Sequence, residues 1–218
     1  LEQLVGLMWD VGLTVGHSVR TIDECVAEAA NDVTIRTSLL EARLLRGNRI
    51  LYRRFTQALA SAMDSQGFLK AKINEQAMRH ARFHDTAYKL EPNIKESPGG
   101  LRDLQSVLWI ARGLGIADSW NGLVRAGLIT PAEAKRIRRH ELALQTLRVR
   151  LHYLANRRED RLLFDFQNAL AAQLGFHDHA KWRASEQLMQ HYYRSARFVG
   201  LMNEILLQTL REQAIPQP

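Results

Sequence analysis

Apolar residues recur every three or four positions along most of the chain, which is the spacing of helices with one buried face. Beyond residue 48 this pattern predicts helices over residues 49–63, 68–84, 101–114, 119–125, 130–156, 166–174 and 181–213. Thr130, Pro131 and Glu133 combine an N-cap residue, a first-turn proline and an N3 carboxylate, which together favour a helix start. The sequence therefore predicts a domain of several antiparallel helices over residues 48–218.

The first 47 residues show a different pattern. Apolar and polar residues alternate from Leu13 to Arg20, which is typical of a half-buried strand. We interpret the apolar run from Ser38 to Leu45 as a second strand, although helix and strand are hard to separate in so short a run. Because a sheet of two strands is marginal by itself, we expect further strands to precede Leu1. The predicted fold is mostly α, with the helical domain attached to a small α/β remnant over residues 1–47.

The segment from Leu90 to Leu104 is the long stretch that helical periodicity does not explain. Pro98-Gly99-Gly100 predicts a tight turn, followed by a helix that begins near Leu101. Free backbone N–H groups at that helix start, approached over glycine and flanked by Lys95 and Arg102, could bind a phosphate or a carboxylate. The alternative is an ordinary connector with a common cap, and both interpretations stay open.

A second candidate site lies on the strand predicted over residues 38–45. Glu41 and Arg43 are two positions apart, so they would project from the same face of a sheet. A carboxylate in that position could bind Mg²⁺ beside other carboxylates. The alternative is a surface Glu–Arg pair on a sheet with one solvated face.

Composition narrows the choice of partners only slightly. The net charge of +7 permits nucleic acid, a nucleotide or an acidic protein, and selects none of them. Nucleic acid is the less favoured of these, because aromatic residues do not alternate with the basic runs. Cys25 is the single cysteine, which excludes a disulfide framework and favours a cytoplasmic location. No apolar run approaches the roughly 20 residues of a membrane span, so no membrane is expected as a partner.

Several motifs, in order, resemble a known family. They are WD at residues 9–10, LTVGHSVRT at 13–21, LLEARLLRG at 39–47 and LEPNIKESPGGLRD at 90–103, with shorter similar stretches at 156–165 and around 192–194. Together they closely resemble the bacterial bifunctional uridylyltransferase/uridylyl-removing enzymes, which modify the nitrogen-regulatory PII protein. The Gly-Gly-Leu-Arg-Asp piece alone is shared more widely, and the glutamine synthetase adenylyltransferases are the second family considered.

The resemblance implies a polymerase-β-like nucleotidyltransferase that uses Mg²⁺ to transfer UMP from UTP to a tyrosine of PII. It makes Glu41 the candidate for a catalytic carboxylate and metal ligand, with Arg43 beside it to orient it or to meet a phosphate. The residues expected to bind nucleotide, phosphate or partner are Arg43, Lys95, Gly99, Gly100 and Arg102. The glycine-rich turn and the aspartate pair of such enzymes do not occur in this sequence, so we expect this chain alone not to transfer UMP.

Two hypotheses from other classes accompany this one. The chain could be a non-enzymatic helical module that docks an acidic protein through its basic faces, or it could bind nucleic acid. Salt-dependent affinity for RNA or DNA would indicate the latter.

Overall fold

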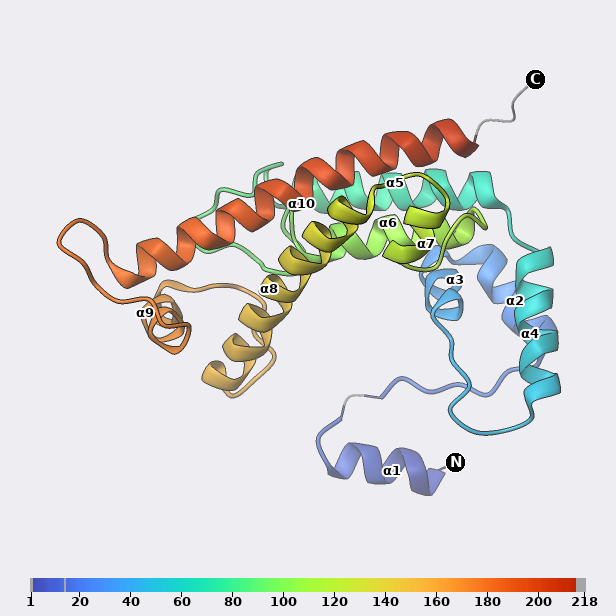
Figure 1. Ribbon diagram of the computed structural model, residues 1–218. Coiled ribbons are helices and arrows are strands. Elements are labelled where there is room, and N and C mark those ends of the chain that lie inside the picture. The colour runs from blue at the N-terminus through green and yellow to red at the C-terminus, as the bar shows by residue number, and fades with distance from the viewer. Residues whose placement is uncertain (1, 14, 215–218) are drawn as a thin grey trace. The chain divides into compact units, whose positions relative to one another are not determined.

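The computed structural model describes residues 2–13 and 15–214, and helices dominate them (Figure 1). The helices are α1 (Glu2–Asp10), α2 (Ile22–Asn31), α3 (Val33–Leu40), α4 (Arg49–Ser61), α5 (Ser65–Arg82), α6 (Leu101–Gly113), α7 (Trp120–Arg125), α8 (Pro131–Ala155), α9 (Phe164–Gln173) and α10 (Ala184–Ala214). The prediction of a mostly helical chain is confirmed. None of the described helices combines the length and the apolarity that a membrane span requires.

The chain divides into two compact units, residues 1–63 and 64–218. The first unit includes α4, which packs against α2. The boundary predicted near residue 47 marked the end of a catalytic sheet. The two compact units are defined by how the helices pack, which does not test where a catalytic domain ends. The boundary near residue 47 therefore stays a prediction.

The strand predicted from Leu13 to Arg20 is absent from the described residues of this segment; Thr14 lies outside them. The segment is an extended loop in which most side chains are exposed, and Val19 keeps 81% of its surface accessible. A strand must pair its backbone N–H and C=O groups with a neighbouring strand, and none is described beside this segment. Alternation of apolar and polar residues was therefore an insufficient signal.

The strand predicted from Ser38 to Leu45 is also wrong. Its first three residues end α3, and the rest form a turn and a loop. The N-cap of α3 is Asp32, whose carboxylate accepts hydrogen bonds from the backbone N–H groups of Thr34 (2.6 Å) and Ile35 (3.2 Å). A capped helix satisfies its own backbone groups without a partner strand, so the short apolar run completes a helix. The structure accordingly shows no small α/β remnant in the described part of residues 1–47.

The second unit is built around α6. The buried face of α6 carries Leu104, Val107, Ile110 and Ala111 at helical spacing, and the helix packs against α5, α8 and α10. Helix α10 runs beside α5 and α6 in Figure 1 and buries an apolar stripe over much of its length. These contacts place the loop between α5 and α6 directly against α10.

The strongest local signal in the sequence gives the expected helix. Thr130 accepts a hydrogen bond from the backbone N–H of Glu133, and the Glu133 carboxylate accepts one from the backbone N–H of Thr130. This capping box opens α8 at Pro131. At the other end Asn156 takes a left-handed conformation (φ 50°) and closes the helix.

Candidate binding site

The loop that precedes α6 is held by its own hydrogen bonds. Its first half runs beside residues 160–162, where the N–H of Ile94 donates to the carbonyl of Asp160 (2.8 Å). The N–H groups at the start of α6 are also paired: those of Gly100, Leu101 and Arg102 donate to the carbonyls of Ser97 (2.8 Å), Ile94 (3.1 Å) and Lys95 (2.9 Å). The free N–H groups that the anion-site interpretation assumed are thus already used within the loop.

The two glycines of the turn are required by packing. Gly99 has a φ of +76°, and a Cβ placed on it would lie 2.1 Å from the carbonyl oxygen of Ala196 in α10. A Cβ on Gly100 would lie 2.7 Å from the carbonyl oxygen of Lys95. Both contacts are with backbone atoms, so rotation of a neighbouring side chain cannot relieve the crowding. The loop and α10 therefore touch backbone to backbone at Gly99.

A buried ionic cluster fixes the same loop to α5. Asp103 has no accessible surface and accepts hydrogen bonds from Arg79 Nη2 (2.6 Å), His80 Nε2 (2.9 Å) and the N–H of Gly99 (2.7 Å). Arg79 also donates to the carbonyl of Glu96 (2.8 Å). Burial alone would raise the pKa of Asp103, but the hydrogen bonds and charges of His80 and Arg79 outweigh it and hold this pKa below its usual value.

The two cations of the loop lie together, as the sequence predicts, and both are paired with Glu96. Its Oε1 lies 3.2 Å from Arg102 Nη2 and 3.4 Å from Lys95 Nζ. Partial burial would raise the pKa of Glu96, and the two cations lower it below its usual value. Arg102 also donates to Gln105 (3.0 Å) and lies over the Trp109 ring, 5.1 Å from its centroid. The structure thus brings Lys95, Gly99, Gly100 and Arg102 into one turn, and their role in binding stays a prediction.

Glu41 and Arg43 belong to the first unit and do not lie on a strand. Glu41 is the C-cap residue of α3, and Arg43 follows in a loop; both side chains are exposed. Within the described residues, no group of three or more His, Cys, Asp or Glu side chains is placed to hold a metal ion. A single exposed carboxylate does not make a Mg²⁺ site, which needs several oxygen ligands. The described residues of this chain therefore do not form a metal site by themselves.

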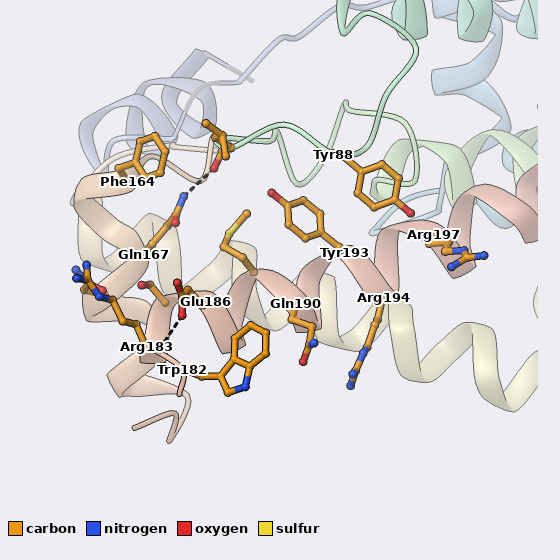
Figure 2. A pocket seen from close by; sticks show the side chains of 14 residues that line it. Tyr88, Phe164, Gln167, Trp182, Arg183, Glu186, Gln190, Tyr193, Arg194 and Arg197 are labelled. Atoms are coloured by element: carbon orange, nitrogen blue, oxygen red, sulfur yellow. Dashed lines mark hydrogen bonds between the residues drawn. The ribbon is translucent and has the colours of Figure 1, made fainter. Parts of the chain in front are cut away.

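A groove that the sequence did not predict lies in the second unit, between α9, the first half of α10 and the segment around residue 88 (Figure 2). It has a volume of about 740 Å³, and four aromatic side chains line it: Tyr88, Phe164, Trp182 and Tyr193. The lining comes from three segments, residues 88–90, 164–168 and 182–197, of which the first is far from the other two in the sequence. The stretches of family similarity at 90–103, 156–165 and around 192–194 each include a lining residue, but none of them indicated a groove.

Hydrogen bonds between elements hold the walls of the groove in place. The hydroxyl of Tyr193 donates to the carbonyl of Lys89 (2.9 Å), and the amide of Gln167 donates to the carbonyl of Leu90 (2.9 Å). The rings of Tyr88 and Tyr193 are 5.5 Å apart between centroids. Burial raises the pKa of the Tyr193 hydroxyl, so it stays a neutral donor at physiological pH. The segment around residue 88 is thereby fixed to α9 and α10.

The second unit is thus helical, with one tightly closed loop and one open groove lined by aromatic side chains. A family model described as GlnD PII-uridylyltransferase matches residues 67–207, which is well over half of the chain. The chain belongs to this family, as the resemblance indicated.

Curated relatives agree with this assignment. A bifunctional uridylyltransferase/uridylyl-removing enzyme from Nitrosospira multiformis is 56% identical over 216 residues, covering 99% of this chain and 24% of the relative. Enzymes of the same name from Burkholderia mallei and Burkholderia thailandensis are each 50% identical over 216 residues, covering 99% of this chain and 25% of each relative. The chain thus spans about a quarter of the length of these relatives. No solved structure matches it.

Proposed function

We propose that this chain is a helical region of an enzyme that transfers UMP from UTP to a tyrosine of the nitrogen-regulatory PII protein. The observation that carries the proposal is the family match over residues 67–207, which includes both the loop before α6 and the groove. The relatives cover nearly the whole chain and bear the uridylyltransferase name. The comparisons give no support to the glutamine synthetase adenylyltransferase alternative.

In this proposal the chain supplies binding surfaces more than reacting groups. Arg102 and Lys95, both only partly buried, would meet the triphosphate or an acidic face of PII. Their shared partner Glu96 would orient them, since both cations already contact one of its oxygens. Two positioned cations can stabilise the negative charge that develops on a transferring phosphoryl group.

The metal chemistry is also part of the proposal. We propose that the whole enzyme depends on Mg²⁺ and is cytoplasmic, and that Glu41 joins carboxylates from outside this chain as a metal ligand. When bound, Mg²⁺ would supply neutralisation of the phosphate charge. Arg43, two residues from Glu41, would orient that carboxylate or contact a phosphate.

A labelling assay tests the proposal. The full-length enzyme and this chain alone are each incubated with PII and with UTP or ATP labelled in the α-phosphate. We expect label on PII from UTP with the full-length enzyme, and none with this chain, whose folding is checked by circular dichroism. A parallel incubation with glutamine synthetase and labelled ATP tests the alternative, and label on glutamine synthetase would support the adenylyltransferase interpretation. Efficient labelling by this chain alone would show that the transferring residues had been wrongly placed.

A further inference from the structure

The lining of the groove carries a net positive charge. Three arginines line it, Arg183, Arg194 and Arg197, and none of them forms an ion pair with a described residue. The single carboxylate in the lining, Glu186, accepts a hydrogen bond from the backbone N–H of Arg183 (2.8 Å) at the start of α10. The lining thus carries three arginine charges and one carboxylate that is already hydrogen-bonded. This net positive charge favours an anionic ligand.

The spacing of these cations indicates an elongated ligand. Figure 2 shows Arg183 at the end of the groove near Gln167, and Arg194 and Arg197 at the other end. Eleven residues separate Arg183 from Arg194, which is roughly 16 Å at the helical rise of about 1.5 Å per residue. An extended polypeptide of about five residues covers that distance at about 3.3 Å per residue. A compact phosphate group would meet only one end.

The surface between the cations suits a polypeptide. Tyr88, Trp182 and Phe164 leave 60%, 55% and 53% of their surface exposed, so their rings can pack against apolar side chains. Asn168 and Gln190 are exposed lining residues whose amides have no described hydrogen-bond partner, and such amides can pair with a peptide backbone. Exposed Trp, Tyr and Arg side chains are also the types that dominate binding energy at protein interfaces.

We infer that this groove docks an extended acidic segment of the protein substrate, with acidic side chains at the arginines and an apolar or aromatic side chain between them. The inference rests on the proposed function, since it names the part of the chain that holds the modified protein. The separation of the arginines, with exposed aromatic rings between them, favours this occupant over a nucleotide.

The test is made in the full-length enzyme, with a double variant and a matched control. Arg194→Glu with Arg197→Glu reverses the two charges at one end of the groove. Lys135→Glu with Arg158→Glu makes the same change in net charge at exposed positions outside the lining. Steady-state labelling gives KM for PII, KM for UTP and kcat for each enzyme. Circular dichroism checks that each variant is folded, and Arg194→Ala with Arg197→Ala repeats the test with smaller changes.

We expect the groove variant to raise KM for PII about tenfold, because each lost contact between exposed charges weakens binding severalfold and reversal adds repulsion. KM for UTP and kcat should stay within about twofold of the unaltered enzyme, and the control should change none of the three. Added salt should raise KM for PII in the unaltered enzyme and have less effect in the groove variant, because salt screens exposed charges.

Three results would overturn the docking inference while the enzyme still labels PII. They are a rise in KM for UTP alone, an equal rise in KM for PII in both double variants, and no change in any constant. The first would indicate a phosphate site, and the second a general attraction of charge. An unaltered enzyme that does not label PII would refute the proposed function, and the docking inference would fall with it.

Discussion

Replacing Gly99 by alanine tests whether the loop before α6 and helix α10 need to touch backbone to backbone. The added Cβ would lie 2.1 Å from the carbonyl oxygen of Ala196, where ordinary contact begins at about 3.4 Å. The carbonyl belongs to the middle of a long helix, so the loop has to move away. Residue 99 would also have to keep its φ of +76° with a side chain present.

The expected loss of stability is the sum of two effects. A left-handed conformation costs a non-glycine residue about 1–2 kcal/mol. Overpacking that forces a backbone shift costs about 1–3 kcal/mol more. Gly99→Ala should therefore lower the free energy of unfolding of residues 64–218 by about 2–5 kcal/mol, a large part of the 5–15 kcal/mol typical of a folded domain.

The matched control is Gly115→Ala. Gly115 has nearly the same φ, +71°, but no heavy atom lies within 4 Å of the position its Cβ would take. This variant should show only the conformational cost of about 1–2 kcal/mol. Urea unfolding followed by tryptophan fluorescence measures both variants, because Trp109 and Trp120 are buried in this unit. If the two variants differed by less than about 0.5 kcal/mol, the crowding at Ala196 would have no energetic effect and the reasoning would be refuted.

Three further predictions use other features of the chain. Asp103→Asn should cost about 3–5 kcal/mol, because it leaves the buried Arg79 without its counter-ion. The folded pKa of Asp103 is lowered, so its contribution is complete above about pH 4 and is lost as the pH falls through that pKa. The gap between the two proteins in urea titrations should be smaller at about pH 3 than at about pH 6, with the decrease falling below about pH 4, and a constant gap would contradict this. Tyr192→Phe should leave stability unchanged or raise it by about 1 kcal/mol, because the buried hydroxyl has no described hydrogen-bond partner; a clearly lower urea midpoint would mean that it has one. Glu41→Ala in the full-length enzyme should lower kcat for PII labelling by about 100-fold if this carboxylate binds the metal, whereas Glu28→Ala should not; equal losses would remove Glu41 from the metal site.

Helices with local signals could be predicted from the sequence. The helix over residues 130–156 was predicted from its capping residues and is observed as Pro131–Ala155, because a capping box acts within four residues. The two strand predictions were wrong because a strand has no comparable local signal. A strand depends on a neighbour that can be far away in the sequence, and alternation from Leu13 to Arg20 says nothing about whether one is present.

The candidate site was predicted only in its local parts. The turn at Gly99 and Gly100 follows from the residues themselves, and so does the proximity of Lys95 and Arg102. The distant contacts that hold this loop could not be predicted, because His80, which binds Asp103, lies in α5 and Ala196, which contacts Gly99, lies in α10. The groove was missed entirely, since its aromatic side chains become one surface only when α9 and α10 are packed together.

The hydrogen bonds that tie residues 89 and 90 to Tyr193 and Gln167 determine how this module could be transplanted. An engineer who moved only α9 and α10 into another scaffold would leave the groove without one of its walls. The smallest part that could be moved with the groove intact therefore includes the segment from residue 88 into α6, because Gly99 packs that segment against α10. The groove is formed by three chain segments acting as one component, and a chimaera that divides them should lose the proposed docking.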